Sequence, residues 1–155
     1  MIAKRLEYMN AQTPNINLSI AAQYIKDLSF ENKNFTQFLS NPPKSPQTAL
    51  DFDVVTKDLG SNKHEVTLNI RATVKESEQT IYLLELSYAG AFLLQCSDTN
   101  LAHNVLMLEC PRILFPAART IITHITQDSG FPPLVLTPAI DFAALQHQKK
   151  KETAH

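Results

Sequence analysis

The stretch between Arg112 and Pro133 limits most strictly what this chain can fold into. Gly130 can adopt the left-handed conformation that ends a helix, and Pro132 and Pro133 have no amide proton with which to continue one. Before this stop, apolar residues recur at separations of three and four, which predicts an amphipathic helix with a wide buried stripe: Ile113, Leu114, Ala117, Ala118, Ile121, Ile122 and Ile125. Such a helix needs a partner surface.

Four stretches in which apolar and polar residues alternate predict that partner surface, because a period of two places alternate side chains on opposite faces of a strand. They run from Ile16 to Glu31, from Leu50 to about Gly60, from Glu65 to Lys75 and from Thr80 to Gln95. The third is the most regular, so we expect one of its faces to be covered and the other to be wet. Gly90 predicts a bend or a close backbone approach.

The first alternating stretch is interrupted. Its apolar row is expected to share one face: Ile16, Leu18, Ile20, Ala22, Tyr24, Leu28 and Phe30. Lys26 breaks this apolar row and Ile25 breaks the polar one, which indicates a bulge. Between this strand and the next, residues 32–47 contain Pro42, Pro43 and Pro46 and are predicted to be a long connection.

Strands followed by helices predict the α+β class, with a four-stranded antiparallel sheet and a long kinked helix and a C-terminal helix packed on one of its faces. Asp98 or Thr99 can cap a first helical piece, Pro111 predicts a break or kink, and Asp141 can cap the closing helix from Phe142. We expect a mobile segment at 1–15, a single domain at 16–146 and a disordered, polar and basic tail at 147–155 that includes Lys149–Lys151.

The composition of the chain limits which cellular compartment and which classes of partner are to be expected. The formal charge of −1 gives no reason to expect nucleic-acid binding, no apolar run approaches the roughly 20 residues that span a bilayer, and the N-terminus has no apolar core typical of a secretory signal. Cys96 and Cys110 lie in apolar surroundings and are expected to be reduced thiols. These features favour a cytoplasmic protein that does not insert into a membrane.

No motif predicts catalysis. The five histidines lack the H-E-x-x-H spacing of a zinc site, and three glycines in total exclude a Gly-rich phosphate loop. His103 and Cys110 lie seven residues apart, but a packed imidazole beside a buried thiol is the more ordinary arrangement than a catalytic pair. We therefore expect no catalytic residue, no metal and no cofactor.

Several strings carry a family resemblance. C-P-R-I-L-F-P-A-A-R (110–119), G-F-P-P-L (130–134) and P-A-I-D-F-A-A-L (138–145) occur in an order and spacing that resemble the SecB protein-export chaperone family. Y-I-K-D-L-S-F-E (24–31) and Y-L-L-E-L-S-Y-A-G (82–90) resemble its first and fourth strand motifs. The resemblance implies an ATP-independent chaperone that holds unfolded precursor proteins and delivers them to the SecA motor.

The resemblance also implies site residues. By motif, the SecA-binding surface maps to Asp27, Glu31, Leu83 and Glu85, and the client groove to Phe38, Leu39, Phe131, Leu134, Leu136 and Phe142. Leu84, Leu86 and Tyr88, with the long helix, map to the interfaces of a homotetramer built as a dimer of dimers. From the residues alone, Asp27 and Glu31 lie four apart on a strand and so point the same way about 13 Å from each other.

Two alternatives remain open at this point. A related chaperone could serve one dedicated client, such as the antitoxin of a toxin–antitoxin pair. A sheet wrapped on a long helix also suits a hot-dog-type thioesterase, for which Glu109 and His103 are the nearby candidate residues.

Overall fold

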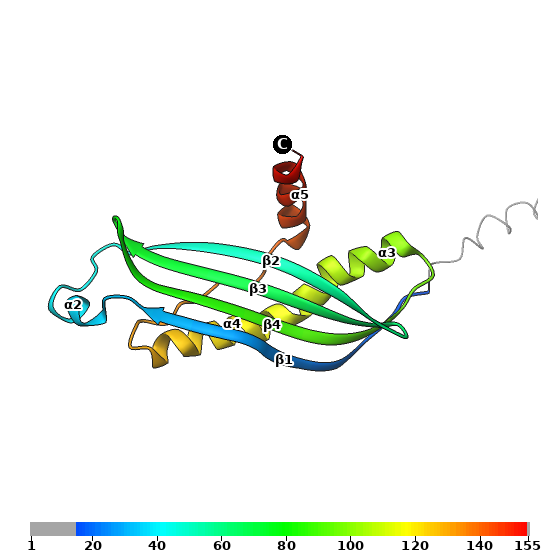
Figure 1. Ribbon diagram of the computed structural model, residues 1–155, viewed down its shortest axis with the longest axis horizontal. Helices are drawn as coiled ribbons and strands as arrows, with labels where there is room; N and C mark the ends of the chain where they lie inside the picture. The colour runs from blue at the N-terminus through cyan, green and yellow to red at the C-terminus, as the bar shows by residue number, and fades with distance from the viewer. Residues whose placement is uncertain (1–14, 155) are drawn as a thin grey trace, which may run out of the picture.

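The fold is seen in a computed structural model that describes residues 15–154. Four strands form one antiparallel sheet in the order β1-β4-β3-β2 (Figure 1): β1 (Asn17–Asn32), β2 (Gln47–Gly60), β3 (Lys63–Glu76) and β4 (Gln79–Gln95). The connection after β1 contains a short helix, α2 (Phe35–Ser40), that the sequence did not predict. Because this connection leads to the far edge of the sheet, β1 pairs with β4 rather than with β2.

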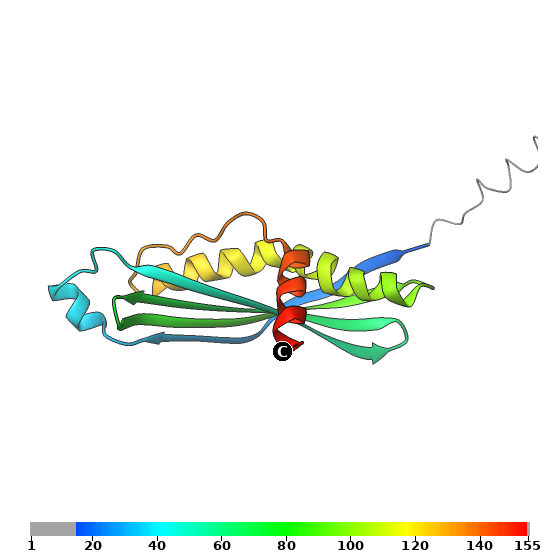
Figure 2. The same cartoon turned by 90° about the horizontal axis from the view of Figure 1, so that it is seen from above.

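The helices lie across one face of this sheet. α3 (Thr99–Asn104), a π-helical turn, η2 (Val105–Glu109), and α4 (Cys110–Asp128) follow one another without a gap and run along the sheet in both views (Figures 1 and 2). The irregularity predicted before the long helix takes the form of η2, which ends just before Pro111. The predicted α+β class, with its antiparallel sheet and helices on one face, is confirmed.

The core lies between the sheet and α4. Val66, Leu68 and Ile70 of β3 are 0–1% exposed, and they meet a helix face that includes Leu114, Ala118 and Ile122. Gly90 permits this approach, since a Cβ atom there would lie 2.9 Å from Leu114 and 2.6 Å from the Phe92 ring. The close approach predicted at Gly90 is therefore present.

This core corrects the assignment of Leu84, Leu86 and Tyr88 to an interface between subunits. Their exposed fractions are 0%, 1% and 8% in the isolated chain, and all three belong to its own hydrophobic core. The long helix of the same chain already covers them, so they leave no surface for a second copy.

β1 carries two bulges rather than one. Register shifts lie between Ile20 and Ala22 and between Ile25 and Asp27. Because each shift reverses the alternation, Ala22 and Tyr24 face away from the helices, whereas Leu18 and Leu28 face toward them. The predicted single apolar row is therefore wrong at Ala22 and Tyr24, and the second bulge restores the predicted faces from Asp27 onward.

The last helix, α5 (Phe142–Thr153), begins at the predicted cap, where the Asp141 carboxylate accepts a hydrogen bond of 3.0 Å from the Ala144 amide. Phe142 is buried against Phe115, and the helix then runs past the β2 edge (Figure 2). The tail predicted to be disordered from His147 is helical through Thr153 in the structure, because this segment consists mostly of good helix formers. The segment predicted to be mobile, 1–15, lies outside the described residues except for Asn15.

Candidate functional site

The sheet face that carries no helix brings the four predicted docking residues together. In the β1–β4 register, Asp27 lies opposite Ser87, Ser29 opposite Glu85, and Glu31 opposite Leu83. Residues directly opposite each other on antiparallel strands share a face. Asp27, Glu31, Leu83 and Glu85 therefore lie on one surface, which we call the open face.

The open face has a shallow depression of about 290 Å³ with an acidic lining. Asp27 and Glu85 both line it, together with Asp51 and Asp53 of β2. In the stretch predicted to be a strand from Leu50 to about Gly60, Asp51 and Asp53 alternate with apolar residues and so fall on its polar side. Alternation does not reveal which strands are neighbours, so it did not connect them with Asp27.

The chain supplies its own cations to this surface. Arg71 pairs with Glu85, with 2.6 Å between Nε and Oε1, and Lys149 of α5 pairs with Asp53. At the rim, Lys33 donates a hydrogen bond to Glu31 and lowers the pKa of that carboxyl. Five carboxylates (Asp27, Glu31, Asp51, Asp53 and Glu85) thus face three cations (Lys33, Arg71 and Lys149), so the surface stays net acidic.

The other half of the open face is already neutralised within the chain. Glu65 accepts hydrogen bonds from Lys26, at 2.6 Å, and from the Tyr24 hydroxyl, and these two donors, in that order, lower the pKa of its carboxyl. Tyr24 lies in register with Ala89 and Thr67, which are 0% and 6% exposed. Among the described residues of the open face, the carboxylates without an ion pair, Asp27 and Asp51, lie in the half that lines the depression.

A second candidate surface lies at the end of the sheet beside α2. Phe30, Phe35, Tyr82 and Phe131 form an aromatic cluster from four different segments, with ring centroids 4.9–6.1 Å apart. Burial raises the pKa of Tyr82. Gly130 has φ +89°, and a Cβ atom there would lie 2.9 Å from the Phe35 ring, so glycine ends α4 and also makes room for the cluster.

The segment between Gly130 and the start of α5, residues 131–141, which we call the crossover, is held to α4 by hydrogen bonds. Thr126, which is fully buried, accepts a hydrogen bond of 2.9 Å from the Leu134 amide, and the Thr123 hydroxyl donates one of 3.0 Å to the Leu134 carbonyl. Both backbone groups of Leu134 are therefore fixed by threonine side chains. This side of the aromatic cluster is rigid.

The predicted groove residues divide into two groups. Phe131 belongs to the aromatic cluster and Phe38 packs beside it, Leu134 is half-buried, and Leu39 is 69% exposed. Leu136 and Phe142, in contrast, are 3% and 1% exposed and belong to the core. These two are core residues in the structure rather than lining of an open groove, because the crossover and the first turn of α5 pack them against the helix layer.

Other exposed apolar side chains escaped the sequence reasoning. Val135 of the crossover is 69% exposed beside the buried Leu136, and Ile113 on the outer side of α4 is 42% exposed. Two isoleucines on the edge strand β1, Ile20 and Ile25, are 41% and 48% exposed. Helical spacing identified Ile113 as apolar but could not separate the sheet side of a wide stripe from its outer side.

The candidate catalytic groups do not meet. His103 is exposed, whereas Cys110 is fully buried, and burial, with a smaller contribution from Glu109, raises the pKa of this thiol to about 12. Glu109 is turned to Arg112, with 2.8 Å between Oε1 and Nη1, so it is not poised over a ligand tunnel as a thioesterase would require. Within residues 15–154, no cluster of His, Cys, Asp and Glu could hold a metal ion and no helix could cross a membrane.

Comparison with known proteins gives a consistent result. A family model described as preprotein translocase subunit SecB matches residues 10–153. A protein-export protein SecB from Rhodopseudomonas palustris is 41% identical over 141 residues, which cover 91% of this chain and 87% of the relative. One from Beijerinckia indica is 41% identical over 143 residues, which cover 92% and 88%.

A solved structure shows the same fold at much lower identity. It is a SecB-like chaperone from Mycobacterium tuberculosis in complex with a peptide from an antitoxin, with a TM-score of 0.67 and 13% identity, and the match covers 80% of this chain and 91% of that one.

Proposed function

This chain belongs to the SecB family of protein-export chaperones, and from this premise we propose that it binds unfolded precursor proteins in the cytoplasm, keeps them competent for translocation and delivers them to SecA. The proposed function needs neither ATP nor a catalytic residue, because a bound client is released by transfer to the motor. The alternative of a chaperone for one dedicated client is supported only by the fold shared with the antitoxin-bound protein.

The observation that carries the client-binding proposal is the apolar surface beside the aromatic cluster. Leu39, four residues after Phe35 in α2, and Val135, four residues after Phe131 in the crossover, are each 69% exposed, and Phe35 and Phe131 pack against each other. An extended client would remove these groups from water, at roughly 1.5–3 kcal/mol for each fully buried large side chain. Apolar contacts of this kind favour unfolded chains, whose apolar side chains are accessible, and they do not require a particular client sequence.

The acidic half of the open face is the proposed docking site for SecA. A basic segment of the motor would meet Asp27 and Glu85 together with Asp51 and Asp53, which line one depression. Because these groups are exposed, they contribute chiefly to the association rate and to partner choice, and their effect weakens with added salt.

We also propose that the chain works as a homotetramer, a dimer of dimers. The candidate interface residues are Ile113 on the outer side of α4 and Ile20 and Ile25 on the edge strand β1, since these apolar side chains are 41–48% exposed in the isolated chain. They replace Leu84, Leu86 and Tyr88, which are buried in its core. A monomeric mass by light scattering at micromolar concentration would contradict the tetramer.

One experiment separates the two binding activities. Suppression of aggregation of a denatured client and binding to SecA are measured for the wild type and for Asp27→Ala/Glu85→Ala. We expect the double variant to hold the client as well as the wild type does and to bind SecA about tenfold more weakly, since each lost charge contact contributes up to about 1 kcal/mol.

The control is Glu78→Ala/Glu152→Ala, which removes the same charge from two exposed positions outside the depression. Equal weakening of SecA binding in both double variants would show that net charge, rather than the open face, governs docking. Equal loss of holding and docking would refute the division of labour between the two surfaces.

A further inference from the structure

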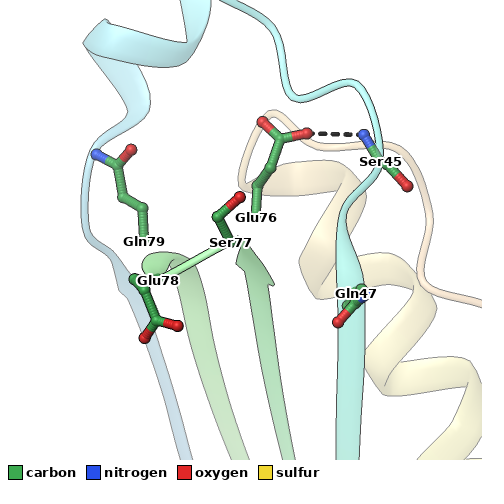
Figure 3. Close-up of a pocket in the computed structure, with 6 residues that line it drawn as sticks. All are labelled: Ser45, Gln47, Glu76, Ser77, Glu78 and Gln79. Atoms are coloured by element: carbon green, nitrogen blue, oxygen red, sulfur yellow. Dashed lines mark hydrogen bonds between the residues drawn. The ribbon is translucent and has the colours of Figure 1, made fainter.

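A polar cavity of about 770 Å³ lies where the β3–β4 turn meets the connection between α2 and β2. Figure 3 shows its lining: Ser45, Gln47, Glu76, Ser77, Glu78 and Gln79. Glu76 extends toward Ser45, whereas the Glu78 carboxylate points away from that residue. The two carboxylates therefore play different parts, although they lie two residues apart.

Glu76 fixes the far end of the α2 connection. A single carboxylate oxygen of Glu76, Oε1, accepts hydrogen bonds from the amides of Lys44, at 2.5 Å, and Ser45, at 2.7 Å. Bonds from backbone amides to a carboxylate are charge-assisted and stronger than neutral ones. They clamp the chain immediately after Pro42 and Pro43, whose fixed φ angles carry this constraint back toward α2.

The near end of the connection is tied to the same hairpin. The Lys33 amide donates to the Ile81 carbonyl at 3.1 Å, and the Gln79 side-chain amide donates to Gln37 of α2 at 2.9 Å. The β3–β4 hairpin thus holds the connection at its start, its middle and its end, and Glu76 supplies the only ionised acceptor among these contacts.

α2 depends on such contacts because it has little stability of its own. It is six residues long, its N-cap makes no side-chain hydrogen bond, and none of its residues is buried. It nevertheless carries Phe38 and Leu39, two of the predicted client-binding residues, and Phe35, which packs edge-on against Phe131. The crossover is fixed separately, by the side chains of Thr123 and Thr126.

We infer that Glu76 is a positioning residue for client binding: its carboxylate holds the α2 connection against the β3–β4 turn, so that Phe38 and Leu39 form an ordered wall of the client surface. The inference rests on the proposed chaperone function. Glu76 itself does not touch the client. Without its carboxylate, the client must order the α2 connection when it binds, and this ordering cost reduces the affinity.

The test uses the full chain as wild type, Glu76→Ala, Glu76→Gln and Glu78→Ala. Hydrogen exchange is measured for residues 35–47, and affinity is measured for a labelled, reduced and carboxymethylated polypeptide that stays unfolded in buffer. Glu76→Ala should speed exchange in this segment and weaken affinity about tenfold, which corresponds to about 1.4 kcal/mol of ordering cost on binding. Glu76→Gln, which keeps an acceptor but loses the charge, should fall between Glu76→Ala and the wild type.

Glu78→Ala is the matched control, because it removes a carboxylate from the same turn and the same cavity lining but not the one that binds the two amides. It should leave both exchange and affinity unchanged. SecA binding should also stay unchanged in all variants, which separates a local effect on α2 from general unfolding, and the isosteric Glu76→Gln keeps the test valid if Glu76→Ala folds poorly.

Four results would overturn the inference. Wild-type affinity in both Glu76 variants would show that the wall needs no such positioning, and unchanged exchange would show that Glu76 does not hold the segment. An equal loss of client affinity in Glu78→Ala would show that net charge, rather than the hydrogen bonds of Glu76, causes the effect. Failure of the wild type to bind the unfolded polypeptide would refute the proposed function, and the inference with it, so the two failures are distinguishable.

Discussion

The two faces of the sheet differ although the same four strands build both. On the face beneath α4, Leu68 and Leu86 are 0% and 1% exposed, and the chain covers this face by itself. On the open face, the Glu85 and Asp53 side chains are 42% and 45% exposed and pair with Arg71 and Lys149. The covered face therefore holds the fold together, while the charged side chains of the open face stay accessible to solvent.

The largest expected effect is a difference in stability between variants of Leu86 and Glu85, which are adjacent in β4 and point to opposite faces of the sheet. Leu86→Ala should lower the free energy of unfolding by about 2–5 kcal/mol, because it leaves a cavity beneath α4. Glu85→Ala should change it by less than about 1 kcal/mol, since it removes an exposed ion pair. Urea unfolding of both variants gives the comparison directly.

SecA binding should show the reverse order for the molecules that remain folded. Leu86→Ala should bind with the wild-type affinity, and Glu85→Ala should bind more weakly. Similar losses of stability in the two variants would mean that the open face also carries the fold, and the contrast between the faces would then fail.

The next prediction tests whether water reaches the core between the sheet and α4. Cys110 lies fully buried at the start of α4, and burial raises the pKa of its thiol from its ordinary value of 9.0 to about 12. The unfolded chain therefore loses this proton as the pH rises above 9, while the folded chain keeps it until about 12. Stability that is fully present below pH 9 is consequently lost as the pH rises toward 12, at about 1.4 kcal/mol per pH unit.

The measurement compares urea unfolding of the wild type and Cys110→Ala at several pH values from 8 to 10.5. The advantage of the wild type should shrink above pH 9, because the variant lacks the titrating thiol while the other groups are common to both chains. A difference that stays constant over this range would indicate that water reaches the thiol.

The sequence predicted the covered face better than the open one. Strict alternation from Glu65 to Lys75 placed β3, observed at Lys63–Glu76, because one buried face imposes a period of two on a strand. The stop at Gly130 was equally clear, since its φ of +89° favours glycine. Both features report burial or backbone geometry at single positions.

What escaped prediction depends on contacts between distant segments. Asp51 and Asp53 line the same depression as Asp27. This could be recognised only from the strand order β1-β4-β3-β2, which the periodicity of a single strand does not encode. α2 was missed because the helical spacing of its apolar residues, Phe35, Phe38 and Leu39, extends over little more than one turn, which is too short to establish a period. Phe142 was assigned to a groove by motif, although its aromatic packing against Phe115 buries it.

The smallest expected effect concerns how far the open face is neutralised by the chain itself. Lys149 pairs with Asp53 inside the acidic depression, so a basic partner must displace this cation. Lys149→Gln should therefore raise the affinity for SecA about two- to fivefold at low salt, which corresponds to an exposed ion pair of about 0.4–1 kcal/mol. The gain should disappear near 1 M salt, where the Debye length is about 3 Å.

Lys150→Gln is the matched control, because it removes the same charge from the next residue, which is exposed and lies outside the depression. Calorimetric titration of SecA into the wild type and both variants measures the difference. A gain in affinity confined to Lys149→Gln would show that the ion pair between Lys149 and Asp53 competes with SecA for the open face. Equal gains in both variants would instead reflect the net charge of α5, and the ion pair with Asp53 would then have no separate part in docking.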